Sequence, residues 1–160
     1  SVAKLAFVQI RNATAADIPA LQALAGNAEA AAQWSEAAYR QALAPTSGQA
    51  VLVGDNGAIQ GFIVARDMGP EWEIENIVVA APAQRQGLGS RLLLAILEQA
   101  RRSGANAVFL EVRESNQAAR ALYEKWGFKQ SGRRKSYYRN PEEDALVYKK
   151  ILSAEVRESC

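Results

Sequence analysis

The chain contains no histidine, and its single cysteine, Cys160, is the last of its 160 residues. Without an imidazole, the Ser-His-Asp and Cys-His arrangements of nucleophilic hydrolases are excluded in their usual form. A tetrahedral zinc site of cysteine and histidine ligands is excluded as well. No acidic spacing of the calcium-loop kind occurs, so we expect no metal site. If the protein is an enzyme, its base must be a carboxylate, a lysine, a tyrosine or a water relay.

Other scarcities narrow the class of protein. No stretch approaches the ~18 consecutive apolar residues of a membrane span, and a lone cysteine cannot form an internal disulfide, which fits a reducing cytoplasm. Lys and Arg number 19 against 17 Asp and Glu, which is too small an excess to indicate nucleic acid binding. We expect one domain over residues 1–152, a loose tail over 153–160, a cytoplasmic location, and a monomer or weak homodimer.

The hydrophobic pattern predicts the element order β-α-α-β-β-β-α-β-α-β-β. Strands are expected at 5–11, 49–53, 58–65, 71–79, 107–112 and 145–152, and helices after a Thr14–Asp17 capping box, after Ser35, over 88–102 and over 116–126. The strand–helix–strand order in the middle requires a right-handed parallel crossover. The flanking hairpins require antiparallel pairs. The expected fold class is therefore α/β, with a mixed and mostly antiparallel sheet and helices on both faces, and not a doubly wound Rossmann fold.

Alternation along the strands sorts their side chains onto two faces. In the strand 71–79 it places Trp72, Ile74, Asn76 and Val78 on one face and Glu71, Glu73, Glu75, Ile77 and Val79 on the other. In the strand 107–112 it places Glu111 opposite Val108, Leu110 and Val112. A carboxylate in so apolar a strand is partly desolvated, although an exposed glutamate paired with a neighbouring arginine is the alternative.

A glycine-containing turn, Gln84-Arg85-Gln86-Gly87-Leu88-Gly89-Ser90, stands where a strand leads into the longest expected helix. Its glycines allow a tight turn and a close approach of the backbone to a ligand. The start of a helix offers unpaired N–H groups and the positive end of the helix dipole. A phosphate or diphosphate suits such a site, with Arg85 as a second cation, but a simple turn that needs glycine is an equal alternative on spacing alone. The Walker loop and the dinucleotide fingerprint do not match.

Two blocks of sequence, taken in order, carry a family resemblance. The first is Gln84-x-x-Gly87-x-Gly89, after a run that ends Ile77-Val78-Val79. The second comprises Leu110-Glu111-Val112-Arg113, Ser115-Asn116, Ala121-Leu122-Tyr123-Glu124 and Gly127-Phe128. Together they resemble the acetyl-CoA loop and the acceptor half of the GNAT N-acetyltransferases. Trp34-Ser35-Glu36 and the Tyr137-Tyr138 region make the chain look similar to the ribosomal-protein alanine N-acetyltransferases. Gln33 and Ala83 depart from that subfamily, which usually has a proline and often an aromatic residue there.

The resemblance implies an acyltransferase that moves an acetyl group from acetyl-CoA directly to an amine, here the N-terminal α-amine of a protein such as a ribosomal protein. It implies cofactor contacts from Ile77, Val78, Val79, Gln84, Arg85, Gln86, Gly87, Leu88, Gly89, Ser90, Asn116 and Tyr123. It implies acceptor contacts from Trp34, Glu75, Tyr137 and Tyr138. It also places the base at Glu111 and the acid that protonates the departing thiolate at Tyr123.

Several alternatives stay open at this point. Glu73 and Glu75 compete for the role of base, because other branches of the family take it from the earlier strand. On the helical pattern alone, Tyr123 fits a packed core aromatic better than an acid. The basic run 133–135 is interpreted as a solvated turn, so direct nucleic acid binding is not expected. An α-amine, with a pKa near 8, needs less help from a base than a lysine side chain, with a pKa near 10.4. The other candidate functions are acetylation of a small-molecule amine, acetylation of a lysine side chain, and binding of acetyl-CoA without catalysis.

Overall fold

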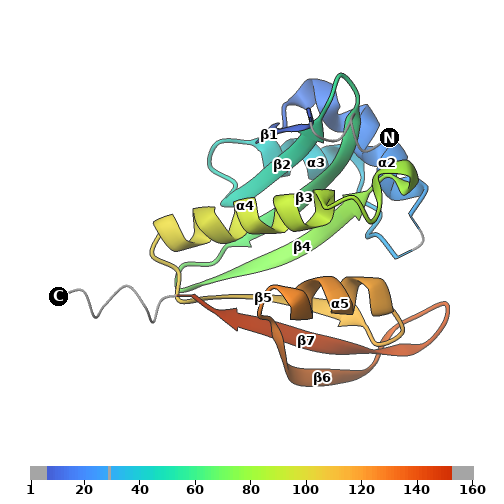
Figure 1. Ribbon diagram of the computed structural model, residues 1–160, viewed down its shortest axis with the longest axis vertical. Coiled ribbons are helices and arrows are strands. Elements are labelled where there is room, and N and C mark those ends of the chain that lie inside the picture. Colours follow the sequence, from blue (N-terminus) through green and yellow to red (C-terminus); the bar gives the residue numbers. More distant parts are fainter. Residues whose placement is uncertain (1–6, 29, 153–160) are drawn as a thin grey trace.

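A mixed sheet of order β1-β2-β3-β4-β5-β7-β6 organises the computed structural model (Figure 1), which describes residues 7–28 and 30–152. The elements in chain order are β1 (Gln9–Asn12), η1 (Ala15–Asp17), α2 (Ile18–Gly26), α3 (Glu36–Leu43), β2 (Gln49–Asp55), β3 (Ile59–Asp67), β4 (Glu71–Val79), η2 (Ala81–Ala83), α4 (Leu88–Arg102), β5 (Ala107–Arg113), α5 (Gln117–Lys125), β6 (Lys129–Tyr138) and β7 (Glu143–Ile151). The predicted order is confirmed, with two short 3-10 turns added. The expected tail at 153–160 lies outside the described residues, as does the beginning of the first expected strand.

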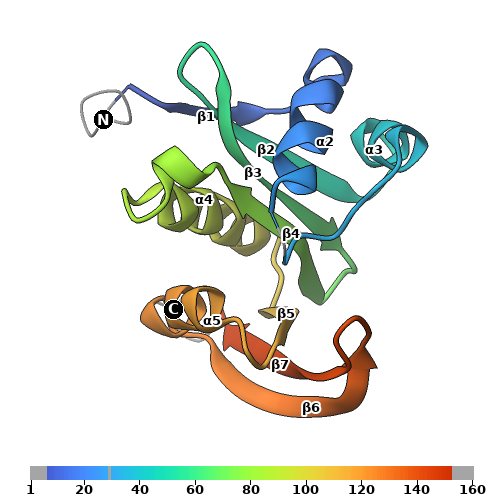
Figure 2. The ribbon, with the colours of Figure 1, turned by 90° about the vertical axis from the view of Figure 1, so that its right-hand side faces the viewer.

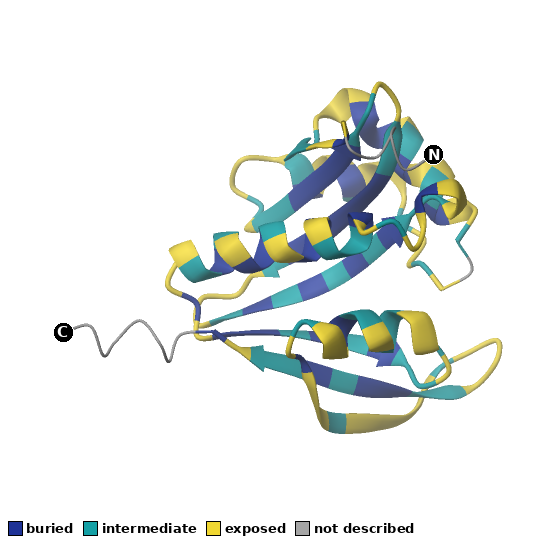
Figure 3. Cartoon of the chain, in the orientation of Figure 1, coloured by how far each residue is buried: buried dark blue, intermediate teal, exposed yellow. Residues whose placement is uncertain are grey.

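Helices cover both faces of the sheet, as predicted (Figure 2). The apolar stripe of α4 is buried in a first core, which α4 and α5 form with the sheet, and exposed positions alternate with it along the helix (Figure 3). On the opposite face, α2 and α3 form a second core, which contains Leu21, Tyr39 and Phe62, all 0% exposed. None of the described helices is long and apolar enough to cross a membrane.

The only parallel pairing in the described part of the chain joins β4 to β5. It runs over residues 71–74 of β4 and 107–110 of β5, with α4 as the crossover, and the other five strand pairs are antiparallel. Beyond these residues β4 continues to Val79 and β5 to Arg113 without pairing with each other. Figure 1 shows the two strands parting. The sheet therefore opens at the C-terminal ends of β4 and β5.

A β-bulge at Glu75 changes the face assignment of β4. The register of β4 against β3 skips this residue. Trp72 and Ile74 pack in the first core, whereas Val78 packs in the second. The prediction that Trp72, Ile74, Asn76 and Val78 share one face is therefore wrong. An extra residue in one strand reverses the side-chain phase beyond it, and simple alternation cannot include this reversal.

The basic run 133–135 lies inside β6 and is not a turn, so that interpretation is wrong. β6 is the edge strand, pairs with β7 on one side only, and is exposed along most of its length. Because neither of its faces is packed in a core, its sequence lacks the apolar alternation that announces a strand. A second irregularity of register, between Arg134 and Tyr138, further interrupts its pattern.

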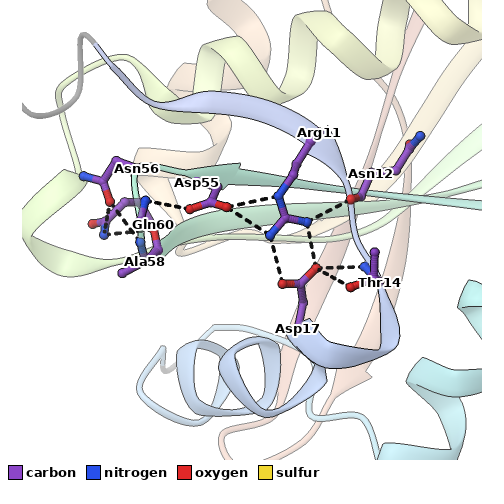
Figure 4. Close-up of polar contacts among 9 residues, drawn as sticks. Arg11, Asn12, Thr14, Asp17, Asp55, Asn56, Ala58 and Gln60 are labelled. Carbon is purple, nitrogen blue, oxygen red and sulfur yellow. Dashed lines mark hydrogen bonds and ion pairs between the residues drawn. The ribbon is translucent and has the colours of Figure 1, made fainter.

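An ion-pair cluster around Arg11 connects β1, the first strand, to the 3-10 turn η1 and to β2 (Figure 4). Arg11 donates to both carboxylate oxygens of Asp17, at 2.8 and 3.0 Å, and to Asp55 of β2 at 3.0 Å. The Thr14 N–H also donates to Asp17 at 2.8 Å, in the half of the capping box that closes back on the backbone. These charges lower the pKa of Asp17, with the hydrogen bond from Arg11 as the largest cause.

Candidate active site

The turn before α4 is held open by its backbone conformation. Gly87 caps the helix with φ 92° and ψ 0°, and a Cβ atom placed there would meet nothing within 4 Å. Arg85 is exposed and also has a positive φ of 65°. The first backbone hydrogen bond of the helix runs from the Arg91 N–H to the Gly87 carbonyl, at 3.0 Å. The N–H groups that precede it have no acceptor within the helix, so a bound anion can satisfy them.

The side chains of two glutamines, both predicted to contact the ligand, brace this turn; the predicted contact stays a prediction. Gln84 donates from Nε2 to the Val79 carbonyl at 3.1 Å, and Gln86 donates from Nε2 to the Pro82 carbonyl at 2.9 Å. Their amide groups therefore connect the end of β4 and η2 to the start of α4. Leu88 is buried in the first core, so only its backbone is available to a ligand.

The next two positions of α4 serve contacts with α5. A Cβ at Gly89 would lie 3.4 Å from Leu122 Cδ2, tighter than most real contacts. Ser90 Oγ accepts a hydrogen bond from Trp126 Nε1 at 2.8 Å. The small size of Gly89 and the hydroxyl of Ser90 thus hold α5 against the beginning of α4.

The end of β4 offers a backbone edge to the opening in the sheet. Ile77 and Val79 turn their side chains toward the first core, and Val78 is buried in the second. Within the described residues, no strand pairs with this stretch on the β5 side. Backbone N–H and C=O groups at such an edge are strong hydrogen-bonding groups that a bound molecule can satisfy.

Tyr123 projects from α5 into the first core, where it is 4% exposed. Its ring centroid lies 5.6 Å from that of Phe128 and 6.4 Å from that of Tyr148. Burial raises the pKa of Tyr123, so the phenol keeps its proton at any physiological pH. The helix begins at Asn116, whose side-chain oxygen accepts from the Ala119 N–H at 3.2 Å, so the predicted cap is confirmed.

Glu111 combines the two environments that its sequence left open. The alternation of β5 is confirmed, because Val108, Leu110 and Val112 are buried in the first core and Glu111 faces the other side. Its side chain is only 16% exposed, and it forms an ion pair with Arg134 of β6. It is therefore both partly desolvated and paired with an arginine.

Glu73 lies within electrostatic range of both Glu75 and Glu111. Glu75 is held by Gln49 Nε2 at 2.7 Å and by Arg66 Nε at 2.9 Å. Burial, followed by the negative charges of Glu75 and Glu111, raises the pKa of Glu73. A carboxyl group with a raised pKa is a better proton acceptor near neutral pH.

Two tyrosines of β6 stand beside this group of carboxylates. The rings of Tyr137 and Tyr138 meet edge to face, with centroids 5.2 Å apart. The charge of Glu111 is the largest cause that raises the pKa of Tyr137, and it contributes with burial to raising that of Tyr138. The ring of Trp34 instead contacts Tyr39, in the second core, with the two ring centroids 5.5 Å apart.

Arg113 organises the site in a way that its sequence position did not reveal. Its guanidinium lies 4.3 Å from the centroid of the Tyr138 ring, pairs with Glu143 at 3.3 Å, and donates to the carbonyls of Arg139 and Pro141. It thereby holds the connection between β6 and β7 against the end of β5. The pattern around Glu111 includes Arg113, but its partner is 30 residues away, so spacing alone could not identify the contact.

Comparisons with known proteins identify the family. Residues 16–128 match the model of the "Acetyltransferase (GNAT) family". The ribosomal protein bS18-alanine N-acetyltransferase of Escherichia coli K12 is 35% identical over 136 residues, which cover 82% of this chain and 88% of that protein. The N-alpha-acetyltransferase RimI of Mycobacterium tuberculosis is 35% identical over 121 residues, covering 73% and 75%.

A solved structure gives the same answer for the fold. The crystal structure of the ribosomal-protein-S18-alanine N-acetyltransferase from Escherichia coli superposes with a TM-score of 0.83 at 30% identity, covering 94% of this chain and 97% of that chain. The family model and these relatives confirm the resemblance that the two sequence blocks carried. The chain belongs to the GNAT family of acetyltransferases and is an N-acetyltransferase.

Proposed function

We propose that the protein acetylates the N-terminal α-amine of a protein that begins with a small residue such as alanine. This is the activity for which its ribosomal-protein bS18-alanine N-acetyltransferase relatives are named. One observation carries the proposal. Tyr138 lies within electrostatic range of both Glu111 and Tyr123, since Glu111 raises the pKa of Tyr138 and Tyr138 contributes to raising that of Tyr123. A carboxylate near the end of β5 and a protonated phenol on α5 thus both lie within range of the same tyrosine, beside the opening in the sheet.

Acetyl-CoA fits the groups that surround this opening. The open turn at Gly87 and the first N–H groups of α4 suit a diphosphate, because a helix start favours negative charge. Arg85, exposed beside them, adds a cation. The free backbone edge at 77–79 suits the amide groups of a pantetheine arm. When bound, acetyl-CoA supplies the acetyl group as a thioester, and the residues below act on the acceptor amine and on the sulfur.

Glu111 is the proposed base. The α-amine of a peptide has a pKa near 8, so it is only about tenfold protonated at pH 7. A weak base therefore suffices to take its proton, and a largely buried carboxylate fits that task. Glu73 is the competing base, because it shares the surroundings of Glu111 and its pKa is raised. Glu75 is less suited, since Gln49 and Arg66 already engage its two oxygens.

Tyr123 is the proposed acid. The departing thiolate of CoA, whose thiol pKa is near 8.5, leaves more readily when it receives a proton. Tyr123 retains its proton because burial raises its pKa. Among the described residues its hydroxyl has no hydrogen-bond partner, so donation to a bound sulfur atom would break no existing bond.

The acceptor is proposed to bind on the side of the sheet that carries Glu73, Glu75 and Glu111. Three carboxylates, with Arg66 and Arg134 as their nearest cations, favour a positively charged ammonium group. Tyr137 and Tyr138 would border the acceptor, and Trp34 would reach it only from the loop before α3. The cytoplasmic location, the single domain over 1–152 and the monomeric or weakly dimeric state belong to the same proposal.

A peptide panel tests the acceptor. One peptide has a free N-terminal alanine, a second has the same sequence with an acetylated N-terminus and an internal lysine, and a third acceptor is a small diamine. We expect release of CoA thiol with the free-alanine peptide alone. Acetylation of lysine in the blocked peptide, or of the diamine, would contradict the N-terminal assignment. Binding of acetyl-CoA without thiol release on any amine would indicate a non-catalytic module.

A further inference from the structure

Tyr148 forms a buried polar contact under α5 that packing alone does not require. It lies on β7, between β5 and β6, and is 1% exposed. Its hydroxyl donates to Glu124 Oε2 at 2.6 Å and accepts from Arg120 Nε at 3.0 Å. Burial and the bond to Glu124 raise the pKa of Tyr148, so its hydroxyl remains a donor.

The partners of Tyr148 stand one helical turn apart on α5, with Tyr123 between them in sequence. Arg120 also donates from Nη1 to the Glu114 carbonyl at 2.8 Å, in the segment that leads from β5 into α5. The rings of Tyr148 and Tyr123 meet edge to face at a centroid distance of 6.4 Å and an interplanar angle of 61°. One side chain thus contacts the Tyr123 ring directly and fixes two neighbouring positions of its helix.

A second buried tyrosine shows what the hydroxyl adds. Tyr39, in the core on the opposite face, is 0% exposed, and its hydroxyl has no partner among the described residues. Tyr148 is buried to the same extent but has two charged partners. Charge-assisted hydrogen bonds of this kind are stronger and more directional than neutral ones. Tyr148 therefore sets the orientation of α5 as well as filling the core.

We propose that Tyr148, through Arg120 and Glu124, is a positioning residue that holds the Tyr123 hydroxyl in place for proton donation to the leaving thiolate. The inference rests on the proposed role of Tyr123 as the acid. Without the Tyr148 hydroxyl, Arg120 and Glu124 lose their shared partner on β7, and the part of α5 that carries Tyr123 can shift, and the Tyr123 hydroxyl with it. A misplacement of about 1 Å at a reacting group can cost up to about 10²-fold in rate. The turn at Gly87 is not touched, so cofactor affinity is retained.

A double-mutant cycle tests this role. Tyr148→Phe should lower kcat about tenfold, which is part of the 10²–10⁴-fold that a general acid supplies. The KM for acetyl-CoA should stay within twofold. In the Tyr123→Phe background, the same substitution should have no further effect on kcat, because the group that it positions is already absent. Tyr39→Phe, which removes a buried hydroxyl without partners, is the matched control and should retain wild-type kcat.

A surface variant keeps the test available if Tyr148→Phe folds poorly. Glu124 is exposed. Glu124→Ala should lower kcat about threefold, as a weaker version of the same loss of positioning, and Glu124→Gln, which keeps an acceptor for the Tyr148 hydroxyl, should restore it. Wild-type kcat in Tyr148→Phe would overturn this inference and leave the proposed function intact. The same holds if Tyr148→Phe lowers kcat equally in the wild-type and Tyr123→Phe backgrounds. Wild-type turnover by Tyr123→Phe would remove the acid role and this inference with it.

Discussion

Gly87→Val separates two reasons for a glycine at the start of α4, namely backbone strain and access for a ligand. At φ 92° an L-residue is strained, and a β-branched one especially so. A Cβ at this position has no neighbour within 4 Å, so no steric clash is added to the strain. We expect a cost of about 2 kcal/mol in the free energy of unfolding, in the range typical of such backbone outliers. For a chain of this size, that corresponds to a fall in Tm of roughly 4–8 °C.

The same side chain would occupy open space beside the first N–H groups of α4. If it prevents one charge-assisted hydrogen bond to a diphosphate, binding weakens by about 1.5–3 kcal/mol. The Kd for acetyl-CoA then rises roughly 10- to 100-fold.

Gly104→Val is the matched control, because it places the same strain at the other end of the same helix. Gly104 has φ 87° and, like Gly87, no neighbour within 4 Å of an added Cβ. Both variants should lose similar stability in thermal unfolding. Titration calorimetry should show weakened acetyl-CoA binding in Gly87→Val only. A Kd in Gly87→Val within twofold of wild type would refute the assignment of this turn as the diphosphate site.

Three further substitutions test the site and the scaffold. Glu111→Gln should lower kcat about 10²-fold, and most at low pH where more amine awaits deprotonation; an unchanged pH–rate profile would transfer the role of base to Glu73. Tyr123→Phe should slow turnover about 10²-fold while its Kd for acetyl-CoA, measured by calorimetry, stays within twofold, and wild-type turnover would reject the acid role. Asp17→Asn should lower stability at pH 7 by about 2 kcal/mol, since it removes the charged partner of Arg11. The pKa of Asp17 is lowered in the folded state. The stability that its charge contributes is therefore fully present above the unfolded pKa of about 4 and is lost as the pH falls through the folded pKa. The difference in Tm between variant and wild type should shrink below about pH 4, and a constant difference would contradict this explanation.

The parts of the fold that are buried on one face could be predicted from the sequence. The stripe of α4 and the alternation of β5 around Glu111 both follow from one hydrophobic face with a fixed period. The bulge at Glu75 could not be predicted, because an extra residue leaves buried positions alternating as before while it moves them to the opposite face. The predicted order includes a strand before 145–152, but the bounds of β6 could not be located, since an edge strand with exposed faces has no apolar period to detect.

The candidate site divides along the same line. Residues in contiguous motifs, such as Gly87 and Asn116, were identified because their roles depend on neighbours in the chain. Contacts made across the sheet, such as Arg134 with Glu111 or Tyr148 with Arg120, depend on the strand order and have no local signal. The side chains of Gln84 and Gln86, which the motif predicts as ligand contacts, donate to carbonyls five and four residues earlier, and their contact with the ligand stays a prediction.

The strand order has a consequence for how the protein forms during translation. The first four strands, within residues 9–79, pair with their neighbours in sequence, and the last three, within 107–151, form a second contiguous block. Among the described residues, only the short pairing of 71–74 with 107–110 joins the sheets of the two blocks. Since the N-terminal part emerges from the ribosome first, β1 to β4 can assemble before β5 is made. The opening between β4 and β5 then exists only after the second block docks, so a ligand that spans it also stabilises that final step by mass action.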